Sequence, residues 1–163
     1  MGEFLEKISE ERKLRRFALA LARTVVNETK HQELIDAVDA AEDFMNGTIT
    51  EAQLATFHAE AERVLENIEQ RELDLPDKIT DSEMEWERAA VAVWTALPPK
   101  FENTSIEAAR QSALHAAHYC RLIRGDEDLQ KQAEVLVSVG LPASAQFRHL
   151  PGDSTKPNAC ENE

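Results

Sequence analysis

The chain has 163 residues, a formal net charge of −13 at pH 7, and charged side chains at 30% of its positions. This length fits a single domain with a substantial core. A net negative charge of this size repels nucleic-acid phosphates and anionic lipid head groups, so neither nucleic acid nor a membrane is expected as a partner. Alanine is abundant and strand-favouring runs are absent, which predicts an all-α bundle of five to six helices with antiparallel helical hairpins.

The compartment and the domain limits also follow from composition. No segment approaches the roughly 20 apolar residues that span a bilayer, and the first residues lack the apolar run of a signal peptide. Cys120 and Cys160 are the two cysteines, too few for a disulfide framework, which favours a cytosolic, reduced protein. A helical domain is expected over residues 1–150. A flexible tail is expected over 151–163, where apolar residues are scarce.

Two helices are expected before the first strong turn. The first covers residues 10–27, with Ser9 as its cap after a short lead-in at 3–8. The second covers 30–46. In both helices a spacing of three and four places the apolar residues on one face. These faces carry Leu14, Phe17, Ala18, Leu21, Ala22 and Val25 in the first helix, and Leu34, Ile35, Val38, Ala41 and Met45 in the second.

Residues 44–54 predict a helical hairpin. Gly47 can adopt the left-handed conformation that ends a helix. Thr50 can cap the next helix, and Gln53 can reach back to the backbone N–H of Thr50, which is a capping box. Ile49 and Leu54 stand where a hydrophobic staple would pack.

Four further helices are expected over residues 51–73, 82–97, 104–124 and 126–139. Capping boxes are expected at Ser82 with Glu85 and at Thr104 with Glu107, and Asp126 is expected to cap the last helix. The helix that ends at residue 124 is expected to be the central one. It carries small residues at Ala109, Ala113, Ala116 and Ala117, and other apolar residues off that stripe.

Acidic residues are concentrated in one part of the chain. Residues 28–87 contain eighteen Asp/Glu and four Lys/Arg, a net charge of −14. A solvated helix face that keeps the protein soluble is the ordinary interpretation. The same face could attract a basic protein, as an inhibitor or immunity protein does. The cluster Arg12, Lys13, Arg15 and Arg16 is expected to be solvated or paired within the chain, with RNA or an acidic partner as the alternative.

The strongest metal-binding pattern is His115-Ala-Ala-His118, in which two imidazoles share a helix face. Two ligands do not complete a metal site, and Glu28-Thr-Lys-His31 occurs once, in an expected turn. No metal and no cofactor is therefore expected, and a metal-binding helical protein that uses His115 and His118 remains the alternative. His58 is expected to be a packing residue at the border of an apolar face.

No pattern predicts an enzyme. Cys120 is expected among apolar residues, which raise the pKa of a thiol and make it unreactive. The chain has neither a Gly-x-Ser-x-Gly turn nor a Gly-rich phosphate loop. No catalytic or cofactor-binding residue is therefore assigned.

Three segments of the first half form a recognisable pattern: the one that begins Lys13-Leu-Arg-Arg-Phe-Ala, the segment Ala37-Val-Asp-Ala-Ala-Glu, and the turn followed by Thr50-Glu-Ala-Gln-Leu. In these segments the chain resembles a family of Ala-rich helical proteins common in planctomycete bacteria. The resemblance is best over residues 12–62 and looser to residue 140. Many relatives carry a Cys-Cys pair where this chain has Leu21-Ala22, so no thiol role is carried over. The resemblance implies a helical fold and no activity.

Together these observations predict a non-enzymatic, cytosolic helical protein-interaction module that is a monomer or a homodimer. The alternatives are a metal-binding protein at His115 and His118, and an acidic inhibitor or immunity-type protein that binds a basic partner.

Overall fold

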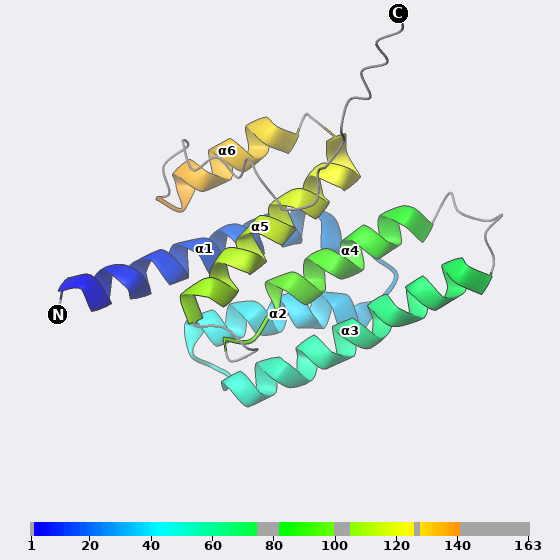
Figure 1. Ribbon diagram of the computed structural model, residues 1–163, viewed down its shortest axis with the longest axis horizontal. Coiled ribbons are helices and arrows are strands. Elements are labelled where there is room, and N and C mark those ends of the chain that lie inside the picture. Colours follow the sequence, from blue (N-terminus) through cyan, green and yellow to red (C-terminus); the bar gives the residue numbers. More distant parts are fainter. Residues whose placement is uncertain (1, 75–81, 100–104, 126–127, 141–163) are drawn as a thin grey trace, which may run out of the picture.

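The computed structural model describes residues 2–74, 82–99, 105–125 and 128–140. These residues form six helices and no strand, which confirms the predicted all-α bundle (Figure 1). The helices are α1 (Gly2–Val26), α2 (Gln32–Asn46), α3 (Glu51–Asp74), α4 (Ser82–Thr95), α5 (Ser105–Arg124) and α6 (Asp128–Ser138). The expected tail at 151–163 and the expected caps at Thr104 and Asp126 lie outside the described residues.

The turn between α2 and α3 has the conformation that its sequence predicts. Gly47 adopts φ 75°, and its N–H donates to the carbonyl of Phe44 while the N–H of Thr48 donates to the carbonyl of Asp43. These two bonds satisfy carbonyls at the end of α2. At the start of α3, the N–H of Gln53 donates to the Thr50 hydroxyl and the N–H of Thr50 donates to the Gln53 side chain. The capping box is complete, and α2 and α3 run antiparallel side by side (Figure 1).

Two other expected boundaries are wrong. Ser9 lies inside α1, which runs unbroken from residue 2 because residues 3–26 contain no Gly or Pro to interrupt it. Helix α2 begins at Gln32, preceded by His31 in extended conformation without a side-chain cap. Helix α4 begins at Ser82, where it was expected to begin. The Glu85 side chain accepts hydrogen bonds from Thr29, in the turn between α1 and α2, and from Arg88 on its own helix.

The bundle has two central helices, α1 and α4, and α5, which was expected to be central, has fewer neighbours. Helix α4 packs against α1, α2, α3 and α5, helix α1 packs against α2, α4, α5 and α6, and α5 packs against α1, α4 and α6. Five consecutive α4 residues, Ala89 to Val93, are buried, so apolar side chains face inward on every side of this helix. The Ala109 and Ala113 stripe of α5 is also fully buried, as predicted, but the far side of α5 is exposed at Arg110 and Leu122.

Candidate functional site

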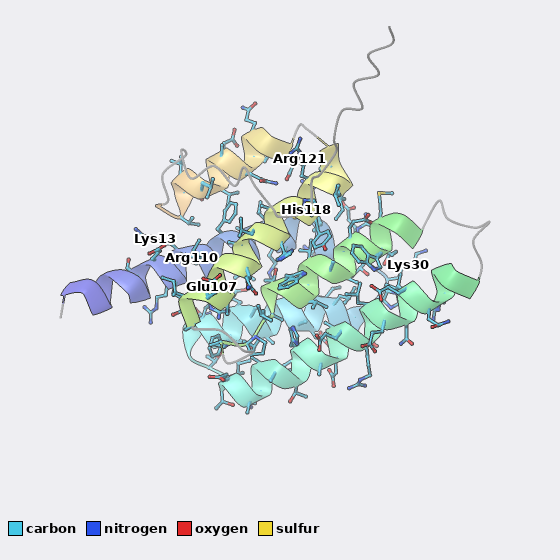
Figure 2. All side chains as sticks on the ribbon, in the orientation of Figure 1. Lys13, Lys30, Glu107, Arg110, His118 and Arg121 are labelled. Carbon is cyan, nitrogen blue, oxygen red and sulfur yellow. The ribbon has the colours of Figure 1, made fainter. Side chains whose placement is uncertain are left out.

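A row of aromatic side chains that ends in one leucine lies where α4 and α5 meet, and we call it the aromatic strip. Its members are Trp86 and Trp94 on α4, and His115, His118, Tyr119 and Leu122 on α5. The α5 members follow a spacing of three and four, which places them on one face of that helix. The two tryptophans, His115 and Tyr119 are half-buried, whereas His118 is exposed and Leu122 is 55% exposed. Figure 2 shows His118 on the half of α5 that leads to α6.

The rings of the strip contact one another in sequence along the two helices. The indole of Trp94 stacks on the imidazole of His115, with ring centroids 3.8 Å apart and an interplanar angle of 11°. His115 is followed by Tyr119 at 6.1 Å, and Tyr119 meets the edge of Trp86 at 5.4 Å. His118 also packs edge-on against Tyr119, at 5.1 Å. Such ring pairs contribute packing energy beyond their buried area and hold the strip in one shape.

Two carboxylates set the electrostatics at one end of the strip. The indole N–H of Trp86 donates to Oε1 of Glu69, 2.9 Å away on α3. Burial raises the pKa of the Tyr119 phenol, and the charges of Glu87 and Glu69 raise it further. These two negative charges, like burial, disfavour the phenolate form of Tyr119.

The histidine pair has the shared face that the sequence predicts, but the rings differ in environment. Burial lowers the pKa of His115, and the neighbouring His118 lowers it further. Nδ1 of His115 is buried and makes no hydrogen bond within the described part of the chain. His118 is exposed. His115 stacks on Trp94. The spacing between His115 and His118 does not predict this contact.

The other candidate ligands do not join this pair. Among the described residues, no group of three or more His, Cys, Asp or Glu side chains could hold a metal ion. Glu28 lies in the turn between α1 and α2, where it pairs with Arg88 at 2.7 Å, and His31 precedes α2. His58 is 2% exposed on α3, so it is a buried packing residue, with Nδ1 3.4 Å from Glu62.

Cys120 has the environment that its sequence neighbours predict. It is fully buried, and its thiol lies 3.6 Å from the carbonyl of Leu21, to which it donates. Burial and the nearby Asp128 raise the pKa of this thiol to about 12. Thiolate is the reactive form of cysteine, so Cys120 is unreactive near neutral pH. Cys160 lies outside the described residues.

The basic cluster of α1 divides into a buried and an exposed part. Arg15 is 6% exposed and donates to Glu11 and to the carbonyl of Leu97. Its guanidinium also lies 5.6 Å from the centre of the Phe44 ring. Arg12 and Arg16 are exposed. The expectation of pairing within the chain is thus confirmed for Arg15. The helical periodicity of the surrounding residues did not distinguish Arg15 from the other basic residues of the cluster.

A cavity of about 520 Å³ lies beside the turn between α1 and α2 and is lined by parts of α4, α5 and α6. Its charged lining residues are Glu28, Arg88, Arg124, Asp128, Lys131 and Glu134. Three cations face three carboxylates, so the lining favours neither an anion nor a cation. Asp128 accepts from Gln132, and Glu134 accepts from Gln130, so these carboxylates already have partners. The cavity therefore offers weaker recognition chemistry than the aromatic strip.

Comparisons of the chain with protein-family models, with curated proteins and with solved structures find no match. The resemblance of residues 12–62 to the planctomycete family therefore stays a prediction. Among the helices that the structure describes, none has the length and apolar character needed to cross a bilayer.

Proposed function

We propose that this protein is a non-enzymatic, cytosolic helical module that binds another protein through the aromatic strip. The observation that carries the proposal is the exposure of this strip. Trp86, Tyr119 and Trp94 keep part of their surface in water, and Leu122 is 55% exposed beside them. Tryptophan and tyrosine are enriched at protein interfaces, where large, stiff side chains bury much area at low entropy cost.

The interior supports a binding role over a catalytic one. Burial raises the pKa of the thiol of Cys120 to about 12, and this thiol donates to a backbone carbonyl. His115 is stacked on Trp94. The small residues of α5, such as Ala109 and Ala113, are buried where this helix packs against its neighbours. These contacts hold α4 and α5 together. A binding surface on a fixed scaffold loses less conformational entropy when a partner binds.

The proposal is tested by capture with matched variants. The full chain, immobilised, is incubated with lysate of its native cells beside the variants Leu122→Asp and Val137→Asp. Val137 is 62% exposed on α6, so this second variant places the same charge at a comparable position outside the strip. We expect a protein that is retained by the parent chain and by Val137→Asp and lost with Leu122→Asp. Identical capture by all three chains would overturn the proposal.

The expected oligomeric state, a monomer or a homodimer, belongs to the same proposal. Sedimentation equilibrium of the parent chain and of Leu122→Asp measures it directly. A homodimer that Leu122→Asp dissociates would make a second copy of this chain the occupant of the strip.

A further inference from the structure

The shape of the strip limits what can bind it. On α5 the strip extends from His115 to Leu122, which is about 11 Å at 1.5 Å per residue. Two turns of a helix have this length, and a helix presents side chains at spacings of three and four, as the strip does. Leu122 at one end provides apolar surface, and Tyr119 contributes a half-buried ring beside it. An amphipathic helix of two to three turns therefore matches the strip in length and in polarity.

The charge around the strip limits the partner further. Glu69 is exposed and accepts the indole N–H of Trp86, while Glu87 is half-buried on α4, and the charges of both act on Tyr119. Among the described residues, the cations closest to the strip in sequence are Arg88 on α4, which pairs with Glu28 and Glu85, and the exposed Arg121 on α5. The faces of Trp and Tyr rings also attract cations. Both effects favour a partner that carries Arg or Lys at the edge of its apolar face.

We propose that the aromatic strip binds a basic amphipathic helix of another protein, with apolar side chains against Tyr119 and Leu122 and an Arg or Lys beside Glu69 and Glu87. This inference rests on the proposed function, since it names the partner chemistry of the same surface. A charged rim of this kind acts on specificity and on the rate of association. The apolar centre supplies most of the affinity.

The chain offers its own reporters for this binding. Trp86 and Trp94 are the two tryptophans of the sequence, and both belong to the strip. In the nitrogen-15-labelled full chain, the two indole N–H signals therefore report on this surface alone. The probe is a synthetic amphipathic peptide of Leu, Ala and Arg, about 18 residues long so that it can form a helix. The counterpart has Glu in place of every Arg.

We expect the Arg peptide to shift both indole signals and the Glu peptide to shift neither. The double variant Glu69→Gln/Glu87→Gln should weaken the affinity for the Arg peptide about three- to tenfold, because two partly exposed charge pairs are lost. The affinity is measured from the indole signal of Trp94, because Glu69 is hydrogen-bonded to the Trp86 indole and its replacement changes the Trp86 signal directly. The control Glu33→Gln/Asp43→Asn removes two exposed carboxylates from α2 and should leave the affinity unchanged.

Three results would overturn the inference: no indole shift with the Arg peptide, an equal shift with the Glu peptide, or equal weakening in the control variant. None of these results affects the capture experiment with Leu122→Asp. If that capture depends on Leu122, the proposed function is kept, with a partner of different chemistry. Loss of that capture, in contrast, would remove the proposed function itself. Circular dichroism of each variant confirms that its helices are retained.

Discussion

The guanidinium of Arg15 lies inside the protein, between α1, the end of α4 and the Phe44 ring. Burial lowers the pKa of this group, while the charges of Glu11 and Glu51 oppose that change. Its bond to the carbonyl of Leu97 is 3.2 Å long and joins residues 82 positions apart. Arg15 therefore fixes the end of α4 to α1, a role that a solvated arginine does not have.

Replacement of Arg15 should be costly for this reason. Arg15→Met keeps the aliphatic stem but removes the donor to the Leu97 carbonyl and leaves the Glu11 carboxylate with the Ser105 hydroxyl as its donor. We expect a loss of about 1–3 kcal/mol in the free energy of unfolding, measured by urea titration. Arg16→Met, at an exposed position of the same helix, should change it by less than about 0.5 kcal/mol. Equal losses in the two variants would show that the Arg15 contacts do not contribute.

The histidine pair also yields a test at the residue scale. A catalytic zinc needs three protein ligands and a structural zinc needs four, and His115 and His118 supply two. We expect elemental analysis of the untagged protein to find no stoichiometric metal. The double variant His115→Ala/His118→Ala should match the parent chain. Stoichiometric metal that this variant loses would establish the alternative, a metal-binding helical protein.

At the scale of the helices, the sequence predicted what depends on local chemistry. The cap at Thr50, the left-handed Gly47 and the alanine stripe of α5 are decided by residues within one or two turns, and all three are confirmed. The central position of α4 depends instead on which helices surround it. The segment Ala89-Ala-Val-Ala-Val is apolar on every side of a helix, and this pattern indicates a helix that is surrounded by others.

The aromatic strip could be predicted only in part. The shared face of His115 and His118 follows from their spacing, but the stack with Trp94 requires the register between α4 and α5. That register is set by tertiary packing. Trp94 and Phe57 stand at apolar positions of their helices, and both are half-buried. A tryptophan at the edge of a helix contact has the same helical spacing as one in the core.

The α1–α5 and α4–α5 contacts predict how α5 tolerates a larger residue. Ala113 is fully buried on this helix, so Ala113→Leu adds volume that the neighbouring helices must accommodate. We expect a loss of about 1–3 kcal/mol in the free energy of unfolding. Ala59→Leu makes the same replacement at an exposed position of α3 and should be nearly neutral. A neutral Ala113→Leu would mean that α5 does not pack closely at this position.

At the scale of the whole molecule, the buried His58 and the half-buried His115 couple stability to pH. Burial lowers the pKa of His58 and of His115 below the ordinary value of 6.5. The unfolded chain then binds more protons than the folded chain as the pH falls below about 7. The free energy of unfolding should therefore decrease on acidification toward about pH 5, by at most about 1.4 kcal/mol per pH unit for each histidine.

Urea titrations across this pH range measure the effect. In the double variant His58→Gln/His115→Gln, the decrease between about pH 7 and pH 5 should be smaller than in the parent chain, because neither position titrates there. Equal slopes for the two proteins would show that these histidines do not control the acid sensitivity of the fold.

The charge of the whole molecule leads to a test of the partners that the sequence excludes. Exposed carboxylates line α2 and α3 at Glu33, Asp39, Glu42, Asp43, Glu66 and Glu69, and Arg12 and Arg16 are exposed on α1. A phosphate backbone near α1 would be attracted by these two arginines but repelled by the field of a chain with net charge −13. We therefore expect neither duplex DNA nor single-stranded RNA to bind at about 150 mM salt, as measured by fluorescence anisotropy. Binding that weakens with added salt and disappears in Arg12→Glu/Arg16→Glu would contradict this expectation, because counterion release by those two arginines would then outweigh the acidic helices.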